Sequence, residues 1–126
     1  MSMCANKNIV NYISSYYYMN CLFMLIEFMD GGSLTDIVYG YTKKIPENIS
    51  AYIMREILNG LDFIHDKKQI HRDLKSDNIL VDKNGNIKVA DFGFAIQLTK
   101  EQQKRKSVVG TPAWMAPELI NKNFYN

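Results

Sequence analysis

Two apolar segments near the start of the chain predict a pair of β-strands. Residues 8–17 and 21–28 are rich in β-branched and aromatic side chains, and a short Met19-Asn20 sequence separates them. Such segments on either side of a brief turn favour an antiparallel hairpin. The three consecutive tyrosines at 16–18 fit the end of the first strand and need no further explanation.

Two helices are predicted after the polar sequence at 30–33. Ser33 followed by Asp36 is typical of a capping box at the start of a short helix. Pro46 opens a longer helix that reaches His65. Apolar side chains recur along it at helical spacing and form one stripe, which indicates packing on a core: Ile49, Tyr52, Ile53, Ile57, Leu61 and Ile64.

The second half of the chain predicts another hairpin. Residues 79–81 and 87–90 are apolar, and an Asn-Gly dipeptide at 84–85 lies between them. Because glycine readily adopts a positive φ, this dipeptide favours a tight turn. Residues 97–108 have no clear period and many charges, which predicts a loop, and Pro117 is placed to start a short helix.

Composition adds few constraints. The 126 residues are 47% hydrophobic and 22% charged, which is typical of one globular domain or part of one. The net charge of +2 is not concentrated on one predicted face, so nucleic acid is not expected as a partner. Cys4 and Cys21 form no CxxC pair, so we expect neither a disulfide framework nor a zinc site.

No segment predicts export or membrane insertion. The N-terminus lacks the apolar stretch of a signal peptide. The most apolar sequence, residues 21–29, is interrupted by Glu27 and is too short to span a bilayer. We therefore expect a soluble protein in the cytoplasm.

Three short motifs in the second half carry recognisable chemistry. They are His-Arg-Asp-Leu-Lys-Ser-Asp-Asn at 71–78, Asp-Phe-Gly at 91–93 and Ala-Pro-Glu at 116–118. Each of the shorter two is weak evidence alone, but their order and spacing after the eight-residue motif are specific. Together they resemble the signature of eukaryotic serine/threonine protein kinases: a catalytic loop, a magnesium-binding triplet and the end of an activation segment.

The resemblance extends over residues 6–125 and implies an α+β protein-kinase fold. The sequences at 31–36, 91–95 and 110–118 are similar to the PAK subfamily of the Sterile-20 group. The chain is then interpreted as part of a kinase domain over residues 1–126. About 6–30 would form small-lobe strands and the hinge, and about 31–126 the large lobe through the activation segment.

The resemblance also implies residue roles in phosphate transfer from ATP. Asp73 matches the base that accepts the substrate hydroxyl proton, and Lys75 would contact the γ-phosphate. Asn78 and Asp91 match the two protein ligands of Mg²⁺, whose oxygens suit that ion. The hairpin predicted between them would bring these two positions to one edge. His71 could be taken for a general base, but the resemblance makes it a packed, structural histidine.

The adenine ring of ATP would lie against the first half of the chain. Aligned on the sequence at 31–34, Ile26 falls at the gatekeeper position, between the two lobes. The Glu27 carbonyl and the Met29 N–H would contact the adenine edge, and Leu80 would lie beneath the ring. An ordinary buried strand explains this segment nearly as well without the motifs downstream.

Regulation is expected in the activation segment. Ser107 lies where Sterile-20 kinases tend to carry a phosphorylated residue, and Arg72 is the natural partner of a phosphate there. The basic residues at 104–106 could assist, form a recognition sequence for another kinase, or lie in a solvated loop. Thr111 resembles the residue that bonds to the catalytic loop and favours Ser or Thr substrates.

The chain also departs from the family pattern. It contains no Gly-rich GxGxxG loop and no lysine-bearing strand before residue 6, and it stops soon after Glu118. We therefore expect the stripe of the long helix to lack much of its usual cover, folding to be marginal, and the chain to be inactive by itself. The alternative to an enzyme is a non-catalytic interaction module. Protein substrates are implied, and a small GTPase or an upstream kinase would act through other regions.

Overall fold

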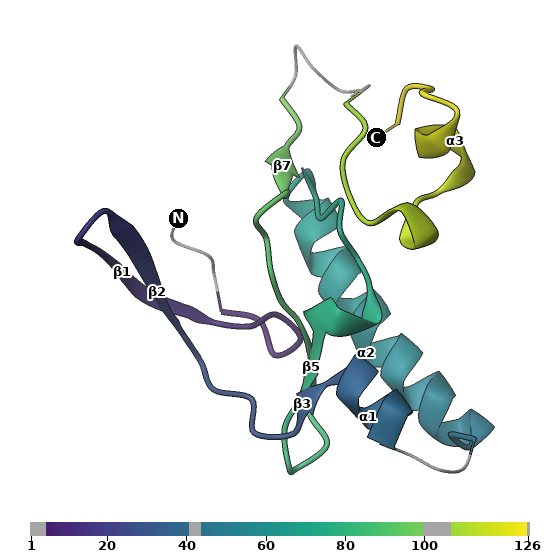
Figure 1. Ribbon diagram of the computed structural model, residues 1–126. Coiled ribbons are helices and arrows are strands. Elements are labelled where there is room, and N and C mark those ends of the chain that lie inside the picture. The colour runs from purple at the N-terminus through teal and green to yellow at the C-terminus, as the bar shows by residue number, and fades with distance from the viewer. Residues whose placement is uncertain (1–4, 41–43, 100–106, 126) are drawn as a thin grey trace.

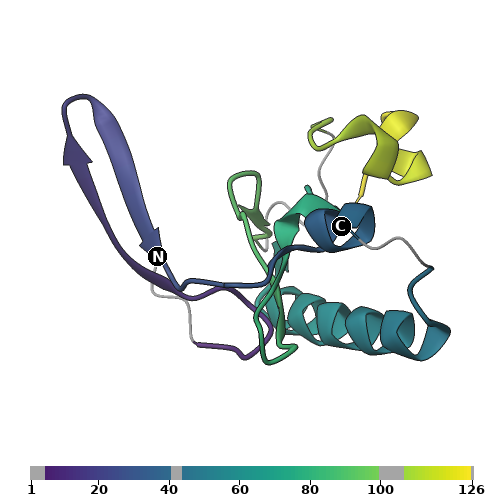
Figure 2. The same cartoon turned by 60° about the horizontal axis from the view of Figure 1, so that its bottom comes forward.

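The computed structural model describes residues 5–40, 44–99 and 107–125. A two-stranded hairpin projects from a body in which a smaller sheet packs on a long helix, and a C-terminal segment lies at the far side from the hairpin (Figures 1 and 2). The described part of the chain contains no helix long and apolar enough to cross a membrane.

The projecting hairpin consists of strands β1 (Tyr12–Tyr18) and β2 (Cys21–Ile26), which pair antiparallel. Met19 and Asn20 connect them with φ values of 46° and 58°, which is typical of a two-residue turn matched to strand twist. The hairpin is therefore confirmed, but β1 begins four residues later than the predicted segment.

Residues 8–10, predicted as part of the first strand, instead pack on the body. The Val89 N–H donates to the Asn8 carbonyl at 2.8 Å, and the Val10 N–H donates to the Val89 carbonyl at 2.9 Å. Gly60 permits this approach, because a Cβ there would lie 2.9 Å from the Asn8 carbonyl oxygen. The β-branched pattern was correct, but the partner strand lies 80 residues away.

The capping box is present at helix α1 (Leu34–Gly40). The Asp36 N–H donates to Ser33 Oγ at 3.1 Å, and the Ser33 N–H donates to Asp36 Oδ2 at 2.9 Å. These bonds satisfy two otherwise free backbone donors at the helix start. The Ser33 hydroxyl, which donates to Asp36 Oδ2 at 2.6 Å, and then the Ser33 N–H lower the pKa of the Asp36 carboxyl.

Helix α2 (Glu47–Asp66) follows Pro46 as predicted. The expectation that its stripe lacks cover is wrong for most of its length. Ile57 and Ile64 are buried, and the Ile53 and Leu61 side chains pack against the same cluster. The start of the helix agrees with the expectation, since Ile49 is 45% and Tyr52 37% exposed. The cover comes from the β-hairpin of the body and from Ile9, which pack on this face.

The body sheet has the order β3–β5–β6, with strands β3 (Gly32–Ser33), β5 (Ile79–Val81) and β6 (Ile87–Val89). Gly85 forms the predicted turn between β5 and β6 with a φ of 83°. The core between this sheet and α2 consists of Ile9, Ile57, Ile64, Ile79, Ile87 and Val89. Each such side chain stabilises the fold by about 1.5–3 kcal/mol when fully buried.

The C-terminal part contains short elements only. Strand β4 (Gln69–Ile70) pairs with β7 (Ile96–Gln97), a 3₁₀ turn covers Pro112–Trp114, and helix α3 (Pro117–Ile120) starts at Pro117 as predicted. Of the loop predicted at 97–108, residues 100–106 and the basic sequence at 104–106 lie outside the described residues. Gln97 belongs to β7 rather than to that loop.

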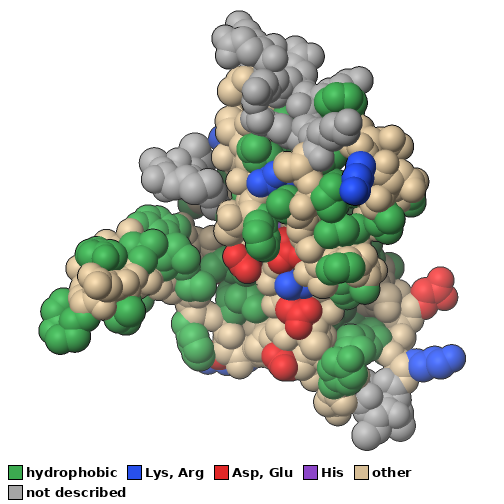
Figure 3. Space-filling model, turned by 45° about the horizontal axis from the view of Figure 1, so that its top comes forward, with side chains coloured by type: hydrophobic (Ala, Val, Ile, Leu, Met, Phe, Trp, Pro, Cys, Tyr) green, Lys and Arg blue, Asp and Glu red, His purple; other side chains and the backbone are tan. Residues whose placement is uncertain are grey.

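Apolar side chains gather on the projecting hairpin (Figure 3). Tyr17, Leu22 and Met24 are 65–70% exposed, and the nearby Phe28 is 88% exposed. The apolar core of the described residues therefore lies in the body, where the residues with candidate chemistry are also found.

Candidate active site

The hairpin of β5 and β6 brings Asn78 and Asp91 to the same end of the sheet. Ile79 pairs with Val89, and one step further the Ala90 N–H donates to the Asn78 carbonyl at 2.8 Å. Asp91 follows Ala90 directly. Two side chains that are 13 positions apart in sequence are thus fixed on neighbouring chain segments, as the predicted hairpin implied.

Asn78 also connects this edge to Asp73. Its Nδ2 donates to the Asp73 carbonyl oxygen at 2.9 Å and to the Asp73 carboxylate Oδ2 at 3.2 Å. Both side chains are buried, with 5% and 7% exposure for Asp73 and Asn78. A buried carboxylate requires such donors, since removing it from water is otherwise costly.

Two further side chains bind the Asp73 carboxylate. Lys75 Nζ lies 3.2 Å from Oδ2, and Thr111 Oγ1 donates to Oδ1 at 2.7 Å. Lys75 Nζ also donates to Thr111 Oγ1 at 3.1 Å, which closes a three-membered network. The Thr111 bond is the main cause of a lowered pKa of Asp73; Lys75 and Asn78 act in the same direction, and burial opposes them. Asp73 is therefore ionised at neutral pH.

A close backbone approach delivers Thr111 to this network. Gly110 has a φ of 120°, and a Cβ at this position would lie 2.5 Å from the Arg72 carbonyl oxygen. Glycine is required here both for the conformation and for the space. The segment before α3 can thus lie directly on the segment at 71–73.

His71 is a packed residue, as expected. It is 2% exposed, its Nδ1 accepts the Asp73 N–H at 3.3 Å, and its Nε2 donates to the Ala90 carbonyl at 2.9 Å. Burial lowers the pKa of the imidazole, so the ring is neutral with its proton on Nε2. Its ring meets that of Phe92 edge-to-face at 4.8 Å. His71 therefore positions the backbones of Asp73 and Ala90.

Backbone strain marks both sides of the site. Arg72 has a φ of 69° and Asp91 a φ of 59°, values that are uncommon for residues other than glycine. The exposed Asp91 carboxylate accepts the Gly93 N–H at 3.1 Å through Oδ1. Strained residues that persist next to a buried carboxylate indicate a functional site.

Comparison with known proteins decides the family. Residues 1–126 match the model of the protein kinase domain. The chain belongs to the protein kinase domain family. The α+β kinase fold expected from the three motifs is thereby confirmed.

Several relatives of this kinase domain are serine/threonine kinases. The chain is 50% identical over 127 residues to serine/threonine-protein kinase pakB of Dictyostelium discoideum, an alignment that covers 100% of this chain and 15% of pakB. It is 52% identical over 122 residues to pakA of the same organism, covering 96% of this chain and 10% of pakA. The identity to serine/threonine-protein kinase PAK 1 of Mus musculus is 48% over 120 residues, covering 95% of this chain and 22% of that protein.

These similarities confirm the predicted likeness to the PAK subfamily of the Sterile-20 group; a further relative, ste20 of Emericella nidulans, is 49% identical over 120 residues. The chain spans only 10 to 22% of the length of pakB, pakA and PAK 1.

The kinase motif at 71–78 also contacts the segments around Phe94 and Ser107 through Arg72. Arg72 donates from Nε to the Phe94 carbonyl at 2.6 Å and from a terminal nitrogen to Ser107 Oγ at 3.0 Å. The predicted pair of Arg72 and Ser107 is thus in direct contact. The Arg72 side chain therefore binds both the segment after the Asp-Phe-Gly motif and the segment before Gly110.

The side chains expected near adenine are partly brought together. Met29 is buried in a small cluster with Val10 and Ala90, and Leu80 packs against it. Ile26, at the end of β2, is 45% exposed. Glu27 forms an ion pair with Lys88 of β6, a contact that ties the segment after β2 to the body sheet.

A magnesium ion would fit the two expected ligands. Asn78 uses Nδ2 for its bonds to Asp73, so its side-chain oxygen Oδ1 is not used in them. Asp91 is an exposed carboxylate beside it in the fold. Hard oxygens of this kind suit Mg²⁺, which usually takes only one or two protein ligands in addition to phosphate and water. Within the described residues, no group of three or more His, Cys, Asp or Glu side chains is arranged for a metal.

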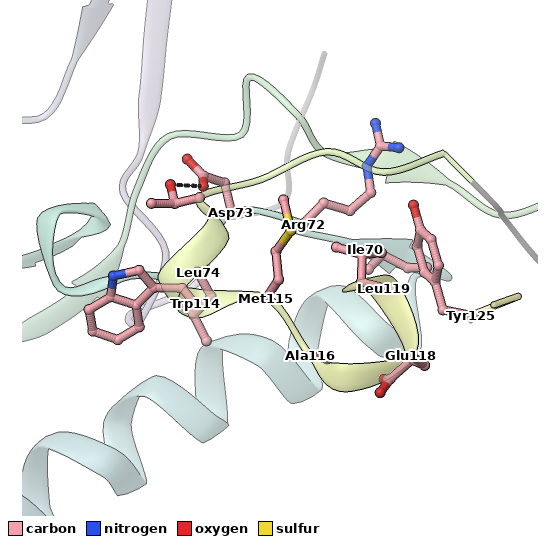
Figure 4. Close-up of a pocket in the computed structure, with 11 residues that line it drawn as sticks. Ile70, Arg72, Asp73, Leu74, Trp114, Met115, Ala116, Glu118, Leu119 and Tyr125 are labelled. Atoms are coloured by element: carbon pink, nitrogen blue, oxygen red, sulfur yellow. Dashed lines mark hydrogen bonds between the residues drawn. The ribbon is translucent and has the colours of Figure 1, made fainter. Parts of the chain in front are cut away.

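A cavity of about 220 Å³ lies beside Asp73 (Figure 4). It extends under the segment before α3, and the side chains of Arg72, Trp114 and Tyr125 contribute to its wall. Figure 4 shows the tip of Tyr125 directed toward the guanidinium group of Arg72.

Sequence reasoning missed one buried network in the kinase domain. Glu56 on α2 is 6% exposed and accepts hydrogen bonds from Asn8 Nδ2 at 2.9 Å and Arg55 Nε at 3.0 Å, with Lys7 Nζ at 3.3 Å. The Asn8 bond is the main cause of a Glu56 pKa lowered to about 2. The only signal in the sequence was an acid next to the apolar stripe, which is also typical of a solvated helix face.

Proposed function

We propose that the protein carrying this sequence is a serine/threonine protein kinase that transfers the γ-phosphate of ATP to Ser or Thr hydroxyls of protein substrates. The supporting observation is the buried, ionised Asp73 carboxylate, bound by Lys75, Asn78 and Thr111. Such a group, fixed in one orientation and next to a cation, is what in-line phosphoryl transfer demands of a protein.

Asp73 acts as the catalytic base. Its low pKa keeps it ionised, and its orientation is set by Thr111 on one oxygen and by Asn78 and Lys75 on the other. It orients the substrate hydroxyl and accepts its proton. His71 cannot take this role, because both ring nitrogens are bonded to the backbone.

Lys75 stabilises negative charge at the transferred phosphate. Its side chain is 23% exposed and its ammonium group lies between Asp73 and Thr111, so it is held at the site while the side chain remains partly accessible. Through the same network, Thr111 couples the segment that would receive the substrate to the base. This coupling supports the preference for Ser and Thr acceptors.

Asn78 and Asp91 hold Mg²⁺, which supplies charge neutralisation at the phosphates when it is bound. Asn78 contributes its side-chain amide oxygen Oδ1 while its Nδ2 orients Asp73, so one side chain serves both the metal and the base. ATP also needs a site for its base. The Glu27 carbonyl and the Met29 N–H bind the adenine edge, Leu80 lies beneath the ring, and Ile26 is the gatekeeper.

Phosphorylation of Ser107 activates the protein, with Arg72 as the receiving group. The existing contact of 3.0 Å between Arg72 and Ser107 Oγ supports this role. Because Arg72 also bonds Phe94, a phosphate on Ser107 would stabilise the segment that carries Asp91.

The protein acts in cytoplasmic signalling. Its partners are protein substrates, and a small GTPase or an upstream kinase regulates it through regions outside this chain. Nucleic acid is not among its partners.

The test is a transfer assay on the full-length protein phosphorylated at Ser107, with Mg²⁺ and γ-labelled ATP. Three peptides that differ only in a single Ser, Thr or Tyr acceptor are compared. We expect label on the Ser and Thr peptides and none on the Tyr peptide. A folded, phosphorylated protein that labels no peptide would contradict the proposal and favour a non-catalytic interaction module.

A further inference from the structure

Ser107 is held from two sides by residues far away in sequence. Arg72 donates to Ser107 Oγ at 3.0 Å from the catalytic loop. From the C-terminal side, the Tyr125 hydroxyl donates to the Ser107 carbonyl at 2.8 Å and lies 3.3 Å from Ser107 Oγ. Tyr125 lies outside all three kinase motifs.

The turn after α3 brings Tyr125 to this position. The Asn123 N–H donates to the Glu118 carbonyl at 2.8 Å, and the Lys122 N–H donates to the Leu119 carbonyl at 3.1 Å. With Lys122 at a φ of 55°, these bonds form a Schellman motif, which ends the helix and reverses the chain. Tyr125 is therefore placed by a defined turn.

The protons in this arrangement can be assigned. The single Tyr125 proton is used in the short bond to the Ser107 carbonyl, so the contact between the two hydroxyls is a bond donated by Ser107. Phosphorylation forms an Oγ–P bond, breaks the bond between the γ-phosphorus of ATP and the bridging oxygen that leaves with ADP, and releases the Ser107 proton. The Ser107 donor is then lost, and three phosphate oxygens that accept hydrogen bonds take its place.

We propose that Tyr125 is a positioning residue that completes the binding site for a phosphate on Ser107, moving its single hydroxyl proton from the Ser107 carbonyl to a phosphate oxygen opposite Arg72. This inference rests on the proposed function only in taking Ser107 as the phosphorylated residue. The phosphate joins the catalytic loop through Arg72 to the turn after α3 through Tyr125. The segment between Ser107 and Thr111 is thereby held on both sides, and Thr111 stays on Asp73.

The test uses full-length protein in which phosphoserine is incorporated at position 107 during translation, so that the sample does not depend on the protein's own activity. Wild type and Tyr125→Phe are compared for the rate at which a broad-specificity phosphatase removes the phosphate. Tyr39→Phe is the matched control, because Tyr39 on α1 is 87% exposed. We expect removal on the order of 10-fold faster in Tyr125→Phe, as for loss of one hydrogen bond to a charged group, and no change in the control.

Phosphorus NMR provides a second readout that a purely structural role of the ring would not change. Donors stabilise the dianion, so the second pKa of the phosphate should lie below the ordinary value of about 6 and move toward it in Tyr125→Phe. Equal phosphatase rates and equal phosphate pKa values in the two proteins would overturn the inference. A faster rate in a protein that labels no peptide would contradict the proposed function and leave this inference supported.

Discussion

The Thr111 hydroxyl donates to the Asp73 carboxylate at 2.7 Å, across 38 positions of sequence. This bond joins the segment before α3 to the motif at 71–78 and is the main cause of the lowered Asp73 pKa. The position of one segment thus affects the pKa and the orientation of a carboxylate on another.

Thr111→Val removes that donor and should raise the pKa of Asp73. Because the proposed base acts in its ionised form, the acid limb of the pH profile of kcat/KM should move to higher pH. At neutral pH, kcat/KM should fall roughly 10-fold, as for loss of a hydrogen bond to a charged group. Thr111→Ser keeps the hydroxyl and should keep the wild-type profile. An acid limb that is identical in Thr111→Val and wild type would show that the Thr111 bond does not set the pKa of Asp73.

Gly110→Ala tests the close approach that positions Thr111. The new Cβ would lie 2.5 Å from the Arg72 carbonyl oxygen, and alanine is disfavoured at a φ of 120°. The two segments must separate, so kcat should fall about 10- to 100-fold, as expected from about 1–3 kcal/mol of local strain.

Gly40→Ala is the control for this change, since a Cβ there has no neighbour within 4 Å. The measurement is kcat of both variants by steady-state kinetics, with thermal melting to check that each is folded. Wild-type kcat in Gly110→Ala would show that the approach is not needed for the reaction.

Asp91→Asn tests the magnesium site. The substitution keeps the shape of the side chain but removes a negative ligand, and affinity for a hard cation depends on ligand charge. The Mg²⁺ concentration for half-maximal rate should rise at least roughly 10-fold, because ligand charge tunes such sites over decades. Asp77→Asn removes an exposed acid from the neighbouring 3₁₀ turn and should leave the magnesium dependence unchanged. The same half-maximal concentration in Asp91→Asn and wild type would exclude Asp91 as a ligand.

Glu56 makes stability depend on pH. Its pKa is lowered from 4.5 to about 2 in the folded protein, so its contribution is present above about pH 4.5 and is lost as the pH falls toward 2. Glu56→Gln should therefore flatten the fall in urea midpoint between pH 5 and pH 2.5. Asp62→Asn, an exposed change on the same helix, should keep the wild-type slope. A slope in Glu56→Gln equal to that of wild type would mean that this network does not act on stability.

Local signals in the sequence predicted much of the fold. The turn at Met19 and Asn20, the capping box at Ser33 and the hairpin turn at Gly85 each depend on a few adjacent residues, and all three are present. The juxtaposition of Asn78 and Asp91 followed from the second hairpin, because strands joined by a tight turn begin and end at one edge.

Contacts between distant segments could not be predicted in this way. Strands β3 and β7 have two residues each and carry no periodic pattern. The buried Glu56 accepts a hydrogen bond from Asn8, 48 positions away, and no local pattern indicates that contact. The place of Tyr125 depends on a left-handed Lys122, although most Schellman motifs have glycine there and the sequence gives no such signal.

Phosphate transfer by the full-length Asp73→Asn protein, compared with Asp77→Asn under the same conditions, tests the central claim most directly. If Asp73 is the base, Asp73→Asn should lower kcat by about 10²- to 10⁴-fold, the usual contribution of general base catalysis, while Asp77→Asn keeps the wild-type rate. A wild-type rate of phosphate transfer by Asp73→Asn would contradict the proposal that Asp73 is the base.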